Sequence, residues 1–171
     1  MAALLSPGRL MLFFASMNLT MDQQAYFDAF LGLHPEIDYS SRRVSAWHFG
    51  SLETETNMLA DLVLKGDKRA TTSAFWCYDG NPDGAPKLGE LSIITYYDGK
   101  PACIIETTRI NKIPFKYVDA AFARTEGEGD KSLGYWRKVH KKAFSSELKR
   151  YGLSFSSRML VLYEEFRVIH R

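Results

Sequence analysis

A β-hairpin between residues 91 and 110 constrains the fold of this chain more than any other feature. Residues 91–97 are rich in β-branched and aromatic side chains, Asp98 and Gly99 follow, and residues 102–110 return with a similar composition. An Asp-Gly pair between two such runs is the usual signal for a tight hairpin turn. The two strands are therefore predicted to be antiparallel, which argues against a doubly wound parallel sheet.

The rest of the chain alternates helical and strand patterns. Helices are predicted at residues 21–33, 53–65 and 118–124, and a last helix is predicted to begin after Asp130 or Ser132 and to run to about Tyr151. Strands are predicted at 46–50, 70–78 and 160–169. Thr20 fits the N-cap of the first helix, and Gly66 fits a left-handed C-cap of the second. This order favours an α+β fold, a small mixed β-barrel with helices packed around it.

Length and composition indicate one domain with a short arm. The chain has 171 residues, of which 46% are hydrophobic, and this is enough for a packed core. We place an N-terminal extension and helix at residues 1–43 and the main domain at 44–171. The net charge is only +2, so a nucleic-acid partner would have to bind a local basic patch.

Cysteine usage and hydropathy both favour a cytoplasmic location. Cys77 and Cys103 are far apart and lack the spacing of metal ligands, so we expect two reduced thiols. The apolar run at 10–15 is too short for a signal sequence, and we expect the first residues to be a weakly ordered extension. No stretch approaches the ~20 apolar residues that span a bilayer, so no membrane contact is expected.

Residues 66–73, Gly-Asp-Lys-Arg-Ala-Thr-Thr-Ser, are the first candidate site because they join a helix to a strand. On a regular strand Lys68 and Thr71 would point to opposite faces, so their joint action requires a turn or bulge after Gly66. With that turn, a desolvated Lys68 can lose its proton and activate the Thr71 hydroxyl as a nucleophile. The alternative is that Lys68 is solvated and Thr71 reflects only β-propensity.

A second polar loop, Glu126-Gly-Glu-Gly-Asp130, allows three interpretations. Glu126 alone can serve as a general acid or base beside Lys68 and Thr71. Glu126, Glu128 and Asp130 together can bind a divalent cation, although their spacing is incomplete for a calcium loop. In the third interpretation Asp130 caps the last helix and the glycines only turn the chain. No metal ligand set is assigned, and no cofactor is required by the sequence.

Basic and aromatic residues suggest how a nucleotide can bind. The last helix and the segment before it are rich in lysine and arginine, including Arg137, and such a face is either solvated or in contact with phosphates. Trp47 can stack on a base, although most such aromatic residues are core. We add Thr72, Ser73 and His140 as further substrate-binding candidates.

The two loops together resemble a known family. Gly66-x-Lys68 followed by Thr71, and later Glu126-Gly-Glu-Gly-Asp130-x-Ser132-Leu133-x-x-Trp136-Arg137-x-x-His140, resemble the ASCH domain, in particular the longer bacterial members. The resemblance covers residue 46 to the end of the chain. It implies a barrel related to the PUA domain, with a cleft that binds RNA or a nucleotide.

The resemblance also implies candidate activities. Short bacterial members are amidohydrolases that deacetylate N4-acetylcytidine with a lysine, a threonine three residues later and a loop glutamate. Lys68, Thr71 and Glu126 match these positions. The broad family pattern instead has a glutamate at the position of Thr71 and an arginine at that of Ser73.

Three functions therefore stay open. The chain can be a ribonuclease of the longer ASCH type, in which Lys68 stabilises charge and Glu126 or His140 moves protons. It can be an amidohydrolase in which Thr71 is the nucleophile, Lys68 its base and Glu126 the acid. It can also be a non-catalytic reader of RNA. The expected partner in each case is RNA or a nucleoside, a divalent metal is possible, and no oligomeric state follows from the sequence.

Overall fold

The computed structural model describes residues 19–39, 42, 44–78 and 84–171. The expected weakly ordered extension at the N-terminus lies outside these ranges, as does most of the predicted loop after Tyr78. Neither cysteine forms a disulfide with the other: Cys103 is buried in the core, and the half-buried Cys77 donates to Glu147 Oε1 (3.4 Å). Within the described ranges, every helix is too short or too polar to cross a bilayer.

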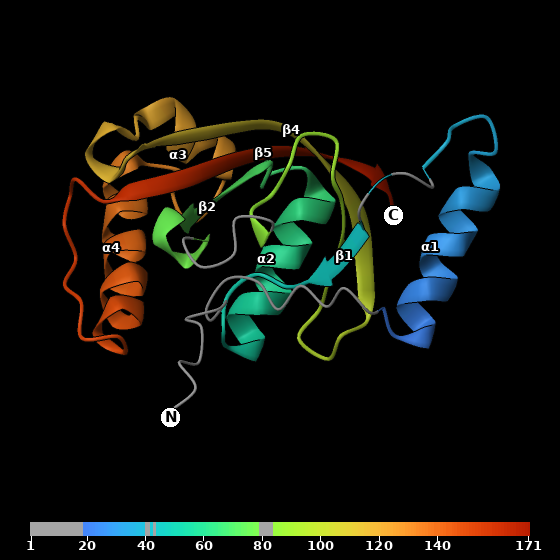
Figure 1. The fold of residues 1–171 in the computed structure, drawn as a ribbon, viewed down its shortest axis with the longest axis horizontal. Coiled ribbons are helices and arrows are strands. Elements are labelled where there is room, and N and C mark those ends of the chain that lie inside the picture. The colour runs from blue at the N-terminus through green and yellow to red at the C-terminus, as the bar shows by residue number, and fades with distance from the viewer. Residues whose placement is uncertain (1–18, 40–41, 43, 79–83) are drawn as a thin grey trace, which may run out of the picture.

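Five strands form one mixed sheet in the order β1-β3-β4-β5-β2 (Figure 1). They are β1 (Val44–Trp47), β2 (Ala70–Ala74), β3 (Leu91–Thr95), β4 (Pro101–Pro114) and β5 (Leu160–His170). β1 is parallel to β3, and the other neighbours are antiparallel. The predicted hairpin is therefore confirmed as β3–β4, and the fold is α+β as expected. β2 occupies one edge of the sheet.

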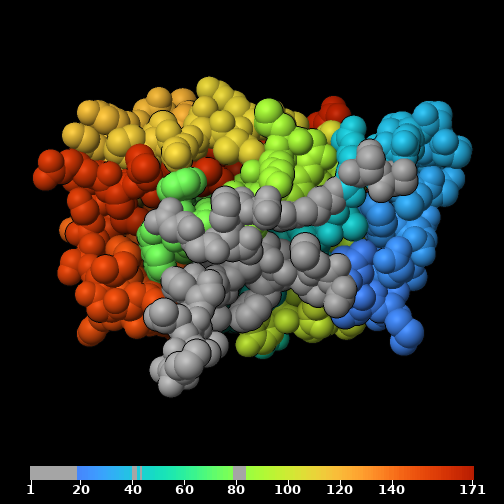
Figure 2. Space-filling view, viewed as in Figure 1, coloured from blue at the N-terminus to red at the C-terminus, as the bar shows by residue number. Residues whose placement is uncertain are grey.

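Four helices pack around this sheet: α1 (Met21–Leu33), α2 (Glu53–Lys65), α3 (Ala120–Glu126) and α4 (Leu133–Lys149). Two short 3-10 helices, η1 (Phe75–Tyr78) and η3 (Phe115–Tyr117), complete the described elements. α1 and α4 form opposite ends of the molecule, as the ribbon and the space-filling view both show (Figures 1 and 2). α1 buries Phe27 and Phe30 against Ile93 and Ile104 of the sheet, so this helix and the main domain share a core.

The strand predicted at 70–78 is too long. β2 ends at Ala74 and the chain turns into η1, where the hydroxyl of Tyr78 folds back and donates a hydrogen bond to Ser73 Oγ (3.0 Å). The aromatic side chains of this segment have high β-propensity, but they are used to cover the end of the sheet near α4. Conversely, β4 runs past the predicted end at residue 110, because β5 pairs with it as far as Pro114.

Gly66 ends α2 as predicted. Its φ of 79° is left-handed, and the N–H groups of Gly66, Asp67 and Lys68 bond to the last carbonyls of the helix, those of Leu62 and Val63. This cap reverses the chain before β2 begins. It therefore supplies the turn that Lys68 needs in order to enter the interior.

α4 begins with a side-chain cap and carries a buried stripe. Ser132 Oγ accepts from the N–H of Tyr135, and Asp130 accepts from the N–H of Ser132. Trp136, His140 and Phe144 follow at helical spacing and are buried. Leu133, on the same side at the start of the helix, is only partly buried. This stripe points His140 at Glu126, the last residue of α3.

Candidate functional site

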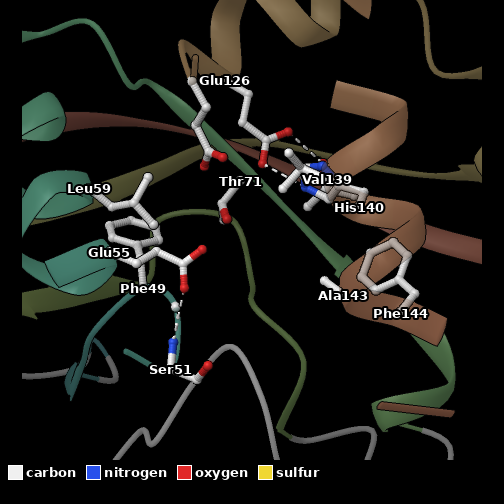
Figure 3. Close-up of a pocket in the computed structure, with 13 residues that line it drawn as sticks. Phe49, Ser51, Glu55, Leu59, Thr71, Glu126, Val139, His140, Ala143 and Phe144 are labelled. Atoms are coloured by element: carbon white, nitrogen blue, oxygen red, sulfur yellow. Dashed lines mark hydrogen bonds and ion pairs between the residues drawn. The ribbon is translucent and has the colours of Figure 1, made fainter. Parts of the chain in front are cut away.

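A small cavity lies between α2, β2, the loop after α3 and α4 (Figure 3). Its volume is about 80 Å³, which accommodates several water molecules or a small planar group. Apolar walls come from Phe49, Leu59 and Phe144, and the polar groups come from Glu55, Thr71, Thr72, Glu126, Glu128 and His140. The cavity therefore combines a mostly apolar lining with a few convergent polar groups, as ligand sites do.

Glu126 is the centre of the polar side of the cavity. It is 1% exposed, and its Oε2 accepts hydrogen bonds from Thr72 Oγ1 (2.9 Å) and from the indole N–H of Trp136. Its Oε1 lies 3.3 Å from His140 Nε2 and 3.6 Å from Lys68 Nζ. Burial by itself would raise the pKa of Glu126, but the charges of His140 and Lys68 and the hydrogen bonds outweigh it and hold that pKa well below its usual range.

His140 is held in one orientation by α4. Its ring stacks on Trp136 with centroids 4.2 Å apart, and Nδ1 lies 3.0 Å from the Trp136 carbonyl oxygen. A carbonyl can only accept, so Nδ1 carries a proton and Nε2 faces Glu126. Burial would lower the pKa of His140, but the Glu126 carboxylate raises it above its ordinary value, with help from Glu128 and the Trp136 carbonyl. The two residues form a buried pair in which each group favours the charged form of the other.

Lys68 lies on the other side of Glu126. The residue is 1% exposed, and its Nζ donates to Glu128 Oε1 at 2.6 Å while lying 4.9 Å from the centre of the Phe49 ring. Glu128 has a side chain that is 17% exposed. Thus one buried ammonium sits between two carboxylates, and one of them has access to solvent.

Thr71 and Thr72 both line the cavity although they are neighbours on β2. Successive strand residues point to opposite faces, so both can reach one cavity only because it lies along the free edge of the sheet. Thr72 is engaged with Glu126. In the described part of the structure the Thr71 hydroxyl has no hydrogen-bond partner, and Figure 3 shows its side chain near the middle of the cavity, opposite Glu126.

The family model of the ASCH domain matches residues 45–170. The chain belongs to the ASCH domain family. The crystal structure of an ASCH domain from Lactobacillus crispatus JV V101 superposes with a TM-score of 0.83 at 34% identity, covering 90% of this chain and 98% of that one. The crystal structure of a protein from Enterococcus faecalis V583 gives a TM-score of 0.75 at 32% identity, covering 86% and 87% of the two chains.

These matches confirm the resemblance and the PUA-like α+β fold of the ASCH domain. The ASCH family is generally linked to RNA binding. Comparison with the curated proteins finds no match. The family model begins after α1, and the division of the chain at residues 43 and 44 stays a prediction.

Three substrate-binding candidates lie apart from the cavity of this ASCH domain. Trp47 is 5% exposed and packs edge-on against Phe49, so it supports the cavity wall from behind. Ser73 is buried and accepts from Tyr78. Arg137 is exposed, and its guanidinium lies 3.4 Å from the carbonyl oxygens of Lys116 and Val118, where it ties α4 to the segment before α3.

Two acidic residues in the lining were not among the predicted site residues. The sequence places Glu128 only among possible metal ligands, although its position two residues after Glu126 indicates that it can face the same space. Glu55 lies in the first turn of α2, and its Oε2 accepts from the N–H of Ser51 (3.4 Å) at the cavity rim. Among the described residues, no group of three or more His, Cys, Asp and Glu side chains is arranged to hold a metal ion. Asp130 instead accepts from the N–H of Ser132, the N-cap residue of α4.

Proposed function

We propose that this ASCH domain binds an acylated nucleoside unit and hydrolyses its exocyclic amide, as in N4-acetylcytidine. The observation that carries the proposal is the convergence of Lys68, Thr71 and Glu126 on one small cavity. Thr71 and Glu126 line it directly, and Lys68 reaches it through its contacts with Glu126 and Glu128. A nucleophile, a cation and a carboxylate at one point are the parts that acyl transfer requires.

The charge of the cavity favours a neutral reacting group over a phosphodiester. Three carboxylates, Glu55, Glu126 and Glu128, face two cationic side chains, Lys68 and His140. A phosphate in this space would meet more negative than positive charge, whereas an acetyl amide carries none. The volume of about 80 Å³ matches an acyl group and the edge of a base, so the sugar would project through the mouth.

Thr71 is the nucleophile in the proposed reaction. Its Oγ attacks the acyl carbon, the carbon–nitrogen bond breaks, and the amine leaves with a proton while an acyl ester forms on Thr71. Water then cleaves this ester, which releases the carboxylic acid and restores the hydroxyl. The net change is addition of one water molecule across the amide bond.

Proton transfer in this scheme uses Lys68 and Glu128. The 2.6 Å hydrogen bond between them gives the Lys68 ammonium a route to release one proton to the carboxylate. The resulting amine takes the Thr71 proton and delivers it to the leaving nitrogen. Glu126, whose pKa is held low, stays ionised and orients Lys68 and His140. This revises the role of proton donor that the sequence resemblance implies for Glu126.

The test is incubation of the purified protein with N4-acetylcytidine and, separately, with a labelled single-stranded RNA. We expect acetate release from the nucleoside and loss of that release in Lys68→Ala. Cleavage of the RNA that disappears in Lys68→Ala would instead select a ribonuclease. RNA binding without any product from either substrate would select a reader. Parallel reactions with a divalent metal determine whether an added cation changes the rate.

A further inference from the structure

A second cavity lies on the other side of Lys68, at the C-terminal end of β5. It has a volume of about 180 Å³. Its walls are the end of α2, the link to β2 and the last residues of β5: Val63, Gly66, Lys68, Arg69, Phe166, Arg167, Val168 and Arg171. Three of these are exposed arginines, and none of the described residues in the lining is acidic.

Nearby acidic groups leave this charge largely unbalanced. Arg167 forms a two-pronged pair with Glu106 Oε2 (2.9 and 2.6 Å), but Glu106 is shared with Arg42. Asp67 is paired with Lys131 (2.7 Å), and it is not one of the residues that line the cavity. The carbonyls of Leu62 and Val63 near the end of α2 already accept from the N–H groups of Gly66, Asp67 and Lys68. The cavity is therefore an electropositive hollow with no competing acceptor among its lining side chains.

The backbone of β5 adds a donor to the same hollow. The N–H of Phe166 donates to the carbonyl of Arg69 (2.9 Å). In the described structure this is the last backbone hydrogen bond on the side of β5 that faces β2. Every second N–H of a β-strand points to the same side. The N–H of Val168 therefore points to the same side as that of Phe166, beyond this last hydrogen bond and towards the cavity. Arginines at a strand edge can also serve to prevent pairing with strands of other molecules. That role can be filled on a flat surface, so it does not account for the cavity.

We propose that this hollow, defined by Arg69, Arg167 and Arg171, binds a phosphate of an RNA chain. Guanidinium groups match phosphate oxygens with paired N–H donors, and backbone N–H groups are common phosphate ligands. The inference rests on the proposed function only in taking the ligand to be a nucleotide. Since Lys68 borders both cavities, the phosphate would sit one side chain away from the reacting group. The preferred ligand is then an RNA rather than a free nucleoside.

The experiment measures binding of a fluorescently labelled single-stranded RNA by anisotropy across a series of salt concentrations. The test variant replaces Arg69, Arg167 and Arg171 by glutamine. The matched control replaces Lys138, Lys141 and Lys142, three exposed residues of α4, by glutamine, so that the net charge changes equally. We expect the test variant to bind at least about tenfold more weakly at about 0.1 M salt, with a log–log salt slope reduced by about 2, and the control to lose less than half as much.

Two further measurements keep the result unambiguous. Arg69→Gln alone breaks no ion pair in the described structure, so it serves as a second test if the triple variant does not fold. This single variant is expected to reduce the salt slope by about 0.7. Inorganic pyrophosphate is titrated while the arginine side-chain N–H signals are followed by nuclear magnetic resonance. Shifts at these arginines together with weakened RNA binding support the proposal. An equal or larger loss in the α4 control, or pyrophosphate shifts with unchanged RNA binding, overturns it. Because the readout is binding, absence of hydrolysis of N4-acetylcytidine does not affect it.

Discussion

Gly127 packs so closely on the carbonyl oxygen of Asp67 that a Cβ atom at this glycine would overlap it. The two residues belong to the two polar loops, which are 60 residues apart in the chain, counting from Lys68 to Glu128. A backbone bond from the N–H of Arg69 to the carbonyl of Thr125 (3.0 Å) holds the same junction. This contact places Lys68 beside Glu126 and Glu128, so the site depends on a glycine that has no chemical role.

Replacing Gly127 by alanine is expected to reduce the free energy of unfolding by about 3 kcal/mol or more. The residue has a φ of 75°, and the added Cβ meets backbone rather than a flexible side chain. Urea denaturation measures the loss. Gly66→Ala is the control, because its φ of 79° is similar but nothing lies within 4 Å of the added atom. Its expected cost is about 1–2 kcal/mol. Equal losses in the two variants would show that the loop contact is not tight.

Thr71→Ala is expected to lower the turnover of N4-acetylcytidine at least about 1,000-fold while leaving its binding intact. The variant removes the hydroxyl that faces the cavity and breaks no hydrogen bond among the described residues. Thr71→Ser keeps the nucleophile and should stay within about tenfold of the parent protein. Steady-state kinetics and equilibrium binding are compared for all three proteins. Full activity in Thr71→Ala would remove Thr71 from its proposed role.

The pair of Glu126 and His140 is expected to stabilise the fold most between about pH 4.5 and 6.5, the ordinary pKa values of the two groups. The folded-state pKa of Glu126 is depressed, so its contribution is present above pH 4.5 and is lost as pH falls towards that lowered value. The folded-state pKa of His140 is raised, so its contribution is complete below pH 6.5 and is lost as pH rises through the raised value.

His140→Gln tests this pH dependence by urea denaturation between pH 3 and 9. Removing one partner of a buried pair should cost about 3 kcal/mol near pH 6, and the difference from the parent protein should shrink at the alkaline end. Glu53→Gln changes an exposed carboxylate at the start of α2 and serves as the control. A difference that stays constant from pH 6 to 9 would show that His140 is not charged in the folded state.

Glu164→Gln is expected to stabilise the protein at alkaline pH. Glu164 is 4% exposed and accepts a hydrogen bond from Thr107 (2.6 Å). Burial, with a smaller effect of Glu90, raises the pKa of Glu164 to about 7. A raised carboxyl pKa means that the folded state binds more protons, so stability falls as pH rises from about 4.5 to 7 and remains lowered above that range.

Glutamine keeps the acceptor and removes the charge, so the gain relative to the parent protein should be about 2 kcal/mol larger at pH 9 than at pH 5. Thermal or urea unfolding at the two pH values measures it. Glu165→Gln, at the next position of β5 and paired with Arg109 at the surface, is the control. If the two variants show the same pH dependence, the burial of Glu164 is not what destabilises the protein.

Local signals in the sequence determined those helices and strands whose ends are set by residues next to them in the chain. α1 and α2 begin and end at the predicted residues because Thr20 caps the first and Gly66 ends the second. The Asp98-Gly99 pair specified the hairpin for the same reason. The N–H of Gly99 closes a turn on the carbonyl of Tyr96 and Gly99 has a φ of 85°, so this local turn needs no distant partner. The family motif, read from the same residues, also predicted the PUA-like fold.

Tertiary structure decided whatever depends on a distant partner. β4 reaches Pro114 because β5 pairs with it, and the chain after Ala74 curls into η1 because Tyr78 meets Ser73 and the end of the sheet needs a cover. Trp47 has the composition of a stacking platform, and only packing on Phe49 makes it core. The pairing of Lys68 with Glu128 likewise required two loops to meet. Propensity and spacing act over a few residues, whereas burial and charge pairing depend on which segments the whole fold brings together.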